Sequence, residues 1–285
     1  MQRALSKTAV IIIGAVLSVL GMLSACTSVK GPTYEKGENP LEKINNYAVY
    51  YGSGRIEELK KFDMVIIQPE SYTADEVGHI RQSGTLVFAY LSVGEAEPYR
   101  WWFELIRDDW ILEKNPNWNS LYVDAGKAGW RSVLTNKVLP KMLQKPFDGL
   151  FLDTLDTVDV YPDTFSGMVR LIKEIHAKYP GKLLIQNRGF SLFDRTASLV
   201  DGIMYEDFRS TYDFSKKEYR LHDLYDTAYS VKERARRNNT VTLSLDYVDP
   251  DNKAVIEECI SSARELGYIP YISTIELTGI YTFTR

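Results

Sequence analysis

Two apolar stretches of this 285-residue sequence end on a carboxylate. Residues 147–153 read Phe-Asp-Gly-Leu-Phe-Leu-Asp and end at Asp153, and residues 200–206 read Val-Asp-Gly-Ile-Met-Tyr-Glu and end at Glu206. Short apolar runs indicate buried strands, and barrel enzymes place their catalytic residues at the carboxyl ends of strands. Because most glycoside hydrolases use two Asp or Glu residues that face one glycosidic bond, the pattern predicts such a pair here. The alternative interpretation is that each carboxylate only caps a following helix.

The elements that must position this pair alternate between strands and helices. Apolar or β-rich runs of strand length occur at 47–51, 64–68, 86–91, 150–153, 183–186, 202–205, 241–245 and 269–272. Stretches with helical period, such as 165–175 and 254–263, lie between most of them. This alternation predicts an α/β fold with a buried parallel sheet, and we expect a single-domain (β/α)8 TIM barrel. An open doubly wound sheet is the alternative, although Tyr51-Gly-Ser-Gly54 lacks the third glycine of a dinucleotide-binding loop.

The connection after the third predicted strand is enlarged, because almost sixty residues separate that strand from Leu150. A βα connection needs far fewer residues, so we expect extra structure in this region. The connection contains all five tryptophans of the chain, namely Trp101, Trp102, Trp110, Trp118 and Trp130. Since the apolar faces of sugar rings pack on aromatic side chains, we expect at least one tryptophan to lie exposed in the cleft. At least three of the five should be core residues.

An apolar stretch near the N-terminus is typical of a signal peptide. Arg3 and Lys7 precede residues 9–23, which have the length of a signal-peptide core and are short for a membrane span. The following Leu23-Ser-Ala-Cys26 resembles the lipobox of bacterial lipoproteins, in which the signal peptide is removed and the cysteine receives lipid. The alternative is an ordinary signal peptide followed by a chance cysteine.

The lipobox predicts how the chain is divided. We expect a signal peptide at 1–25, a lipidated tether at 26–46 and a glycosidase-like barrel at 47–285. The protein would then be an exported lipoprotein of the bacterial cell envelope, periplasmic or at the cell surface, bound to the membrane through a lipid on Cys26. Only Cys259 remains after lipidation, so the exported domain has no internal disulfide to rely on.

Composition and motifs argue against several other functions. A formal net charge of −4 gives no basic surface for nucleic acid. The chain has three histidines and no HxH, HExxH or paired-cysteine spacing, which argues against catalytic zinc. It also lacks the Gly-x-Ser-x-Gly motif of one large class of serine hydrolases. We therefore expect no metal and no cofactor.

Several segments resemble one family of glycosidases. They are Ala-Tyr-Leu-Ser-Val-Gly-Glu-Ala-Glu at 89–97, Leu-Tyr-Val-Asp at 121–124 with Trp130-Arg131, Phe-Asp-Gly-Leu-Phe-Leu-Asp-Thr-Leu-Asp at 147–156, and Met-Tyr-Glu at 204–206. On these motifs the chain from about Tyr47 onward resembles glycoside hydrolase family 114, named for endo-α-1,4-polygalactosaminidase, in its bacterial extracellular lipoprotein branch. The resemblance implies a (β/α)8 barrel with Asp153 and Glu206 as the acidic pair.

The resemblance also implies residues that support this pair. The matching positions are Tyr90, Asp124, Asn187 and Tyr205, although Ala-Gly-Lys-Ala-Gly follows Asp124 where a tighter Asp-rich turn is common. The candidates for substrate binding are Tyr90, Glu95, Asp124, Asp156, Asn187, Tyr205 and Tyr247. Four carboxylates at strand ends form an expected acidic rim that would suit a cationic sugar chain, namely Glu95, Glu97, Asp156 and Asp207.

These observations predict a membrane-anchored glycoside hydrolase that cleaves an amino-sugar-containing polysaccharide resembling polygalactosamine. We assign Asp153 as the nucleophile or base and Glu206 as the general acid of a metal-free reaction. The alternative function is a non-catalytic glycan-binding surface lipoprotein that keeps a glycosidase barrel. That alternative would be favoured by a structure in which the two carboxylates diverge, or in which either forms an ion pair with Arg131 or Arg188.

Overall fold

A computed structural model describes residues 39–223 and 225–282. The predicted signal peptide and lipid attachment site at Cys26 lie outside these residues. Within them, parallel strands form one eight-stranded sheet in which neighbours follow the order of the chain. The strands of this sheet are β1 (Tyr47–Tyr50), β2 (Met64–Ile67), β3 (Leu86–Ser92), β7 (Gly149–Asp153), β8 (Leu183–Asn187), β9 (Gly202–Glu206), β12 (Val241–Tyr247) and β13 (Ile269–Ser273).

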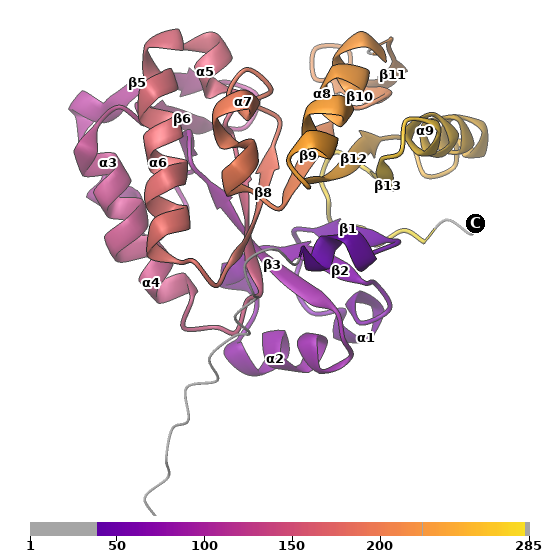
Figure 1. Cartoon of the computed structure of the whole chain (residues 1–285), viewed down its shortest axis with the longest axis horizontal. Helices are drawn as coiled ribbons and strands as arrows, with labels where there is room; N and C mark the ends of the chain where they lie inside the picture. The colour runs from indigo at the N-terminus through magenta and orange to yellow at the C-terminus, as the bar shows by residue number, and fades with distance from the viewer. Residues whose placement is uncertain (1–38, 224, 283–285) are drawn as a thin grey trace, which may run out of the picture.

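The sheet curls into a nearly closed barrel (Figure 1). Its first and last strands face each other through the rings of Tyr47 and Tyr271, whose centroids lie 5.6 Å apart. The loop after β13 adds a further tie, because the Tyr51 backbone N–H donates to the Leu277 carbonyl at 2.7 Å. The predicted (β/α)8 fold and its eight strands are confirmed. The strands are apolar because barrel interior and helix layer bury both faces.

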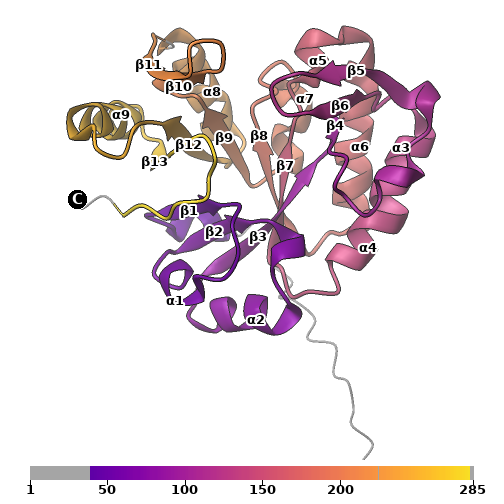
Figure 2. The same cartoon turned by 180° about the vertical axis from the view of Figure 1, so that it is seen from behind.

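Helices cover the outside of the barrel (Figure 2). They are α1 (Ile56–Leu59), α2 (Ala74–Gln82), α3 (Ala128–Val133), α4 (Leu139–Met142), α5 (Thr157–Val160), α6 (Phe165–Lys178), α7 (Phe193–Thr196), α8 (Tyr225–Arg237) and α9 (Lys253–Glu265). α6 buries Met168, Leu171, Ile172 and Ile175, which share one face of a helix. None of the helices in 39–223 and 225–282 is long and apolar enough to cross a membrane.

Two small antiparallel sheets rise beyond the barrel. The enlarged connection after β3 starts with β4 (Glu95–Ala96), β5 (Ile111–Asn115) and β6 (Ser120–Val123), and α3 and α4 follow. The connection after β9 forms a hairpin of β10 (Ser210–Asp213) and β11 (Glu218–Leu221). The predicted extra structure after the third strand is therefore a small sheet followed by helices.

The first described residues close the end of the barrel where the strands begin. The Asn39 side-chain amide donates to the carbonyls of Asp201 and Asn239, just before β9 and β12, at 2.8 and 2.9 Å. Leu41, in a short 3-10 helix at Pro40–Lys43, is fully buried in the core. The barrel domain therefore includes residues 39–46, which we had expected in the tether at 26–46. These residues belong to the barrel domain because they form a helical turn at Pro40–Lys43 and bury Leu41 in the core.

Candidate active site

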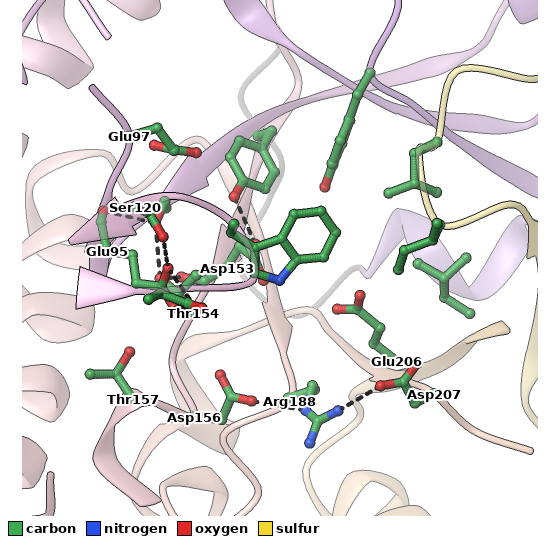
Figure 3. A pocket seen from close by; sticks show the side chains of 18 of the residues that line it. Glu95, Glu97, Ser120, Asp153, Thr154, Asp156, Thr157, Arg188, Glu206 and Asp207 are labelled. Atoms are coloured by element: carbon green, nitrogen blue, oxygen red, sulfur yellow. Dashed lines mark hydrogen bonds and ion pairs between the residues drawn. The ribbon is translucent and has the colours of Figure 1, made fainter. Parts of the chain in front are cut away.

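Asp153 and Glu206 end two barrel strands, and the strand between them ends at Asn187. The Asn187 amide nitrogen donates to Asp153 Oδ1 at 2.7 Å and to Glu206 Oε2 at 2.5 Å. One side chain therefore holds both carboxylates toward the same pocket at the mouth of the barrel, as Figure 3 shows for the two acids. The two carboxylates converge at the strand ends, and Asn187, which the resemblance implied as a supporting residue, contacts both of them.

The shared amide limits the separation of the two carboxylates. Asp153 Oδ1 and Glu206 Oε2 can lie no farther apart than the two hydrogen bonds laid end to end, about 5.2 Å. Retaining glycosidases hold their carboxyl groups roughly 5–5.5 Å apart, whereas inverting enzymes need roughly 6.5–9.5 Å to admit a water molecule between them. The bridge by Asn187 therefore holds one oxygen of each acid within the distance typical of the retaining arrangement.

Each carboxylate has a second partner, a tyrosine hydroxyl. Tyr90 Oη donates to Asp153 Oδ2 at 2.7 Å, and Tyr247 Oη donates to Glu206 Oε1. Both tyrosines are buried and line the pocket. A hydroxyl can reverse from donor to acceptor when its partner gains a proton, so each carboxyl group can be held in either protonation state.

The two carboxyl groups differ in electrostatic surroundings. Burial, followed by the charges of Asp153 and Asp207, raises the pKa of Glu206 to about 8. Burial also raises the pKa of Asp153, but there the hydrogen bonds from Asn187 and Tyr90, which lower the pKa, outweigh the neighbouring charge of Glu97, whereas at Glu206 the neighbouring charges outweigh the hydrogen bonds. Glu206 is therefore suited to carry a proton near neutral pH, and Asp153 to be the anion. Opposed environments of this kind separate the acid from the nucleophile in glycosidases.

The backbone turns sharply after each of these three strands. The residues that directly follow Asp153, Asn187 and Glu206 all have left-handed φ angles, at 63° for Thr154, 50° for Arg188 and 56° for Asp207. Such conformations cost about 1–3 kcal/mol each for residues other than glycine and concentrate at functional sites. Their effect is visible in the pocket, which is lined by consecutive side chains that a continued strand would send to opposite faces.

Thr154 connects the end of β7 to the turn after β3. Its hydroxyl accepts the Gly94 backbone N–H at 2.8 Å and lies 3.0 Å from the Ser92 hydroxyl. A side chain at Gly94 has no space, because an added Cβ would lie 2.2 Å from the Thr154 carbonyl oxygen and 2.5 Å from Thr157 Oγ1. The Ser-Val-Gly-Glu segment therefore packs its backbone directly against the residue that follows Asp153.

We expect Gly94→Ala to lower both stability and activity. The new methyl group would push the Thr154 carbonyl, which belongs to a rigid strand end, so overpacking should destabilise the fold by about 1–3 kcal/mol. Denaturant unfolding and hydrolysis rates check this expectation. Gly78→Ala is the matched control, because its added Cβ meets only Pro146 at 3.9 Å and α2 should gain helix propensity. Equal stabilities of the two variants would contradict the prediction.

The acidic rim is partly neutralised by arginines. Arg188 lies between Asp156 and Asp207 in Figure 3, with nitrogen–oxygen distances of 3.0 and 3.2 Å. The buried Arg100 pairs with Glu97 at 3.1 Å. Burial raises the pKa of Glu95 to about 7, and this residue accepts hydrogen bonds from Ser120 and Asn115. The rim is thus an organised network rather than a set of free charges.

The structure brings most of the predicted site residues to one pocket. Its volume is about 420 Å³, within the range of small-molecule sites. The predicted residues that line it are Tyr90, Glu95, Glu97, Asp153, Asp156, Glu206, Asp207 and Tyr247. Tyr205 does not reach the pocket, because it precedes the inward Glu206 on β9 and packs outward against Phe190 and Phe208.

Asn187 contacts the two acids without lining the pocket, and Asp124 does not line the pocket either. Its carboxylate instead accepts the Gly126 backbone N–H at 2.7 Å, which closes the turn that follows β6. The departure from the family pattern around Asp124 therefore lies in a turn away from the acidic pair.

Several residues that line the pocket were not predicted as site residues, and Tyr51, Arg188 and Phe214 are three of them. Tyr51 packs edge to face on Tyr90 with ring centroids 4.9 Å apart, and its place at the end of the first predicted strand was an available signal. Arg188 follows Asn187, and the sequence indicates it only as an ion-pair partner for the two acids. Phe214 lies in the β10–β11 hairpin, which carries no strong sequence pattern.

The five tryptophans divide between the core and the surface. Trp102 and Trp130 are buried, and Trp110 packs partly against the core. Trp101 is 42% exposed and Trp118 is 52% exposed, and Trp118 lines the pocket. One tryptophan is therefore exposed in the cleft as expected, whereas two, not three, are fully core residues and Trp110 is only partly buried against the core.

The part of the chain that the structure describes has no cluster of three or more His, Cys, Asp or Glu side chains arranged to hold a metal ion. The site itself supplies two carboxyl groups, two tyrosine hydroxyls and one shared amide.

Comparison with known proteins gives a consistent result. A model of glycoside-hydrolase family GH114 matches residues 32–285. An uncharacterized protein of Methanocaldococcus jannaschii is 26% identical over 229 residues, and the match covers 71% of this chain but only 65% of that protein. The glycoside hydrolase domain of PelA from Pseudomonas aeruginosa has a TM-score of 0.74 and 24% identity, with 83% of this chain and 97% of that domain covered.

A second solved structure with the same fold is the complex of Aspergillus fumigatus Ega3 with galactosamine. It has a TM-score of 0.67 and 14% identity, with 87% of this chain and 97% of that chain covered.

Proposed function

Because the chain belongs to glycoside hydrolase family GH114, we propose that Asp153 and Glu206 hydrolyse the glycosidic bonds of an amino-sugar-containing polysaccharide. The observation that carries the proposal is the shared hydrogen bonding of both carboxylates to Asn187, which aims two acids of different pKa at one point of the pocket. A retaining mechanism fits this geometry.

The proposed reaction has two steps. In the first, Glu206 protonates the oxygen of the leaving sugar while an Asp153 oxygen attacks the anomeric carbon, so that the glycosidic bond breaks and a glycosyl ester forms. In the second, the Glu206 carboxylate takes a proton from water, and the water oxygen attacks the anomeric carbon and releases Asp153. Asn187 remains hydrogen-bonded to both acids and keeps them within reach of the same carbon.

The charge of the pocket supports an amino sugar. Its lining carries the carboxyl groups of Glu95, Glu97, Asp153, Asp156, Glu206, Asp207 and Glu276, of which Glu206 holds a proton and Glu97 pairs with Arg100, against a single lining cation, Arg188. This count covers the described residues that line the pocket. An excess of negative charge attracts a chain that bears ammonium groups. Ega3, a structural relative, was solved with galactosamine bound, which is consistent with the same class of sugar.

The non-catalytic alternative receives no support from the ion pairs. Within the described residues, the ion pairs of Arg188 are with Asp156 and Asp207, and that of Arg131 is with Glu174 at 3.4 Å. Asp153 and Glu206 also converge instead of diverging. A site kept only for binding would not need two acids of unequal pKa on one amide.

Hydrolysis of a defined polymer tests the proposal. Purified domain should release reducing ends from partially deacetylated galactosaminoglycan, and proton NMR of the first products should show the anomer of the substrate linkage. Failure to cleave this polymer and related amino-sugar chains would contradict the proposed function. Release of the opposite anomer would contradict the retaining mechanism but leave the proposed hydrolysis in place.

Export and membrane anchoring are further parts of the proposal, supported by the lipobox-like sequence at 23–26. Wild-type protein should partition into detergent and carry acyl chains, whereas Cys26→Ala should lose the acylation completely because it lacks the thiol. Mass spectrometry of the mature N-terminus checks this expectation, and Cys259→Ala is the control that keeps the lipid. Acylated Cys26→Ala protein would show that the lipid is attached elsewhere.

A further inference from the structure

Two hairpins stand on opposite sides of the barrel mouth. One is β5–β6, in the connection after β3, and the other is β10–β11, in the connection after β9. Figure 1 and Figure 2 both place them at the same end of the barrel and on opposite sides. This arrangement follows from topology, since β3 and β9 are the third and sixth strands in the ring of eight.

The turns of the two hairpins meet through aromatic side chains. Trp118 lies in the turn between β5 and β6, and Phe214 directly follows β10. Their ring centroids are 5.1 Å apart with an interplanar angle of 79°, an edge-to-face contact. Both rings line the pocket that contains Asp153 and Glu206. We call Trp118 and Phe214 the aromatic bridge, because their contact joins the two sides of the mouth.

Hydrogen bonds to Glu95 hold the turn that carries Trp118. The Glu95 carboxylate accepts hydrogen bonds from Asn115, the last residue of β5, and from Ser120, the first residue of β6. These two residues flank the turn that carries Trp118, and all three polar side chains are buried. Glu95 therefore fixes the base of this turn.

The Phe214 half is braced by other rings. Phe214 packs edge to face on Tyr212 at 5.3 Å, and Tyr212 contacts Tyr219 across the hairpin at 5.1 Å. The Tyr219 hydroxyl accepts the Ile275 backbone N–H at 3.4 Å, which connects the hairpin to the loop after β13. Both halves of the bridge are thus built into the fold.

Trp118 nevertheless keeps much of its surface free. It is 52% exposed, because an edge-to-face contact occupies only one part of the indole. A large apolar ring with free surface in an acidic pocket matches a pyranose that has an apolar face and ammonium or hydroxyl groups at its edge. The bridge belongs to hairpins that rise beyond the strand ends, so a sugar stacked there would be a different unit of the chain from the one at the acidic pair.

We propose that the aromatic bridge binds a sugar unit away from the scissile bond and makes the enzyme prefer polysaccharide chains to small glycosides. This inference rests on the proposed glycosidase function. A small aryl glycoside occupies only the position at Asp153 and Glu206, whereas a chain extends to Trp118 and gains its stacking.

The test compares two substrates in matched variants. For each protein, kcat/KM is measured on a galactosamine-containing oligosaccharide series and on an aryl galactosaminide. Trp118→Ala should lower the ratio of chain to aryl-glycoside kcat/KM about two- to tenfold, the range expected of one aromatic contact. Phe214→Ala should lower the same ratio less, and the double variant should fall no further than Trp118→Ala, because the two rings act together. Trp101→Ala is the control, since this tryptophan is also exposed but lies outside the pocket lining.

The outcomes separate the two proposals. If the wild type cleaves the chain and Trp118→Ala keeps the full ratio, the bridge proposal is wrong and the proposed function stands. Binding is measured in parallel by quenching of tryptophan fluorescence with the same oligosaccharides. If the chain quenches the wild type and Trp101→Ala but not Trp118→Ala, and no substrate is cleaved, the bridge is supported and the catalytic proposal fails. If the wild type neither binds nor cleaves the chains, both proposals fail.

Discussion

Replacing either acid by its amide should remove most of the hydrolytic activity and leave the fold intact. Glu206→Gln takes away the proton donor, and general acid catalysis contributes about 10²–10⁴-fold to rate. Asp153→Asn takes away the nucleophile, and its loss should be at least as large. Each amide can keep its neighbours, since Asn at 153 can donate to Tyr90 Oη and Gln at 206 to Tyr247 Oη, and Asn187 still finds one acceptor on each side.

A change of leaving group distinguishes the two roles. A glycoside that expels a stable anion needs no proton from the enzyme, so Glu206→Gln should recover much of its loss on that substrate, whereas Asp153→Asn should not. Kinetics on both substrates measure this, with thermal unfolding to verify the fold. Asp251→Asn, at an exposed carboxylate outside the pocket lining, is the control for the chemical change. Full activity in both amide variants would refute the mechanism. If only Asp153→Asn recovered activity on the substrate with the stable leaving group, Asp153 would be the acid and Glu206 the nucleophile.

The second large effect is the dependence of activity on pH. The free enzyme works with Glu206 protonated and Asp153 ionised, so kcat/KM should fall about tenfold per pH unit above the pKa of Glu206, near 8. It should also fall at acidic pH, as Asp153 takes up a proton at a pKa that burial raises above the ordinary value of 3.8. The active window therefore lies between the two, and a kcat/KM profile measures both limbs.

Two variants should move the alkaline limb in opposite directions. The hydrogen bond from Tyr247 lowers the pKa of Glu206, so Tyr247→Phe should move the limb to higher pH. The charge of Asp207 raises that pKa, so Asp207→Asn should move the limb to lower pH. Shifts in the same direction, or an alkaline limb unaffected by either change, would show that another group controls it.

The barrel could be predicted from sequence because its signal is local and repeated. A strand such as Met64–Ile67 is buried on both faces, so every residue in it is apolar. The positions of Asp153 and Glu206 followed from the same pattern, since a buried strand that ends on a carboxylate brings that carboxylate to the mouth. Asn187 came from the family resemblance, and the apolar pattern alone would have ended its strand at Gln186.

The side chains that line the mouth were harder to predict. Resemblance placed Tyr205 beside the pair, although strand alternation sends it outward once Glu206 points inward. Asp124 lies in a turn whose geometry depends on Gly126, and that contact has no periodic signature. Phe214 and Trp118 come into contact from distant parts of the chain. Short polar strands such as Ser210–Asp213 lack the apolar alternation that would predict a hairpin. Local patterns determine elements, whereas contacts between loops depend on the completed barrel.

The attachment of Asn39 to the starting ends of β9 and β12 bears on which polymers the enzyme can reach. The catalytic mouth is at the other end of the same strands, so a lipid on Cys26 would pull on the closed face of the barrel. The thirteen residues from Cys26 to Asn39 span at most about 45 Å when fully extended. An anchored molecule would therefore stay close to its own bilayer, with its cleft on the side of the barrel opposite to the lipid attachment. Glycan arriving from the surroundings, or leaving the cell, would meet the open cleft before it met the membrane.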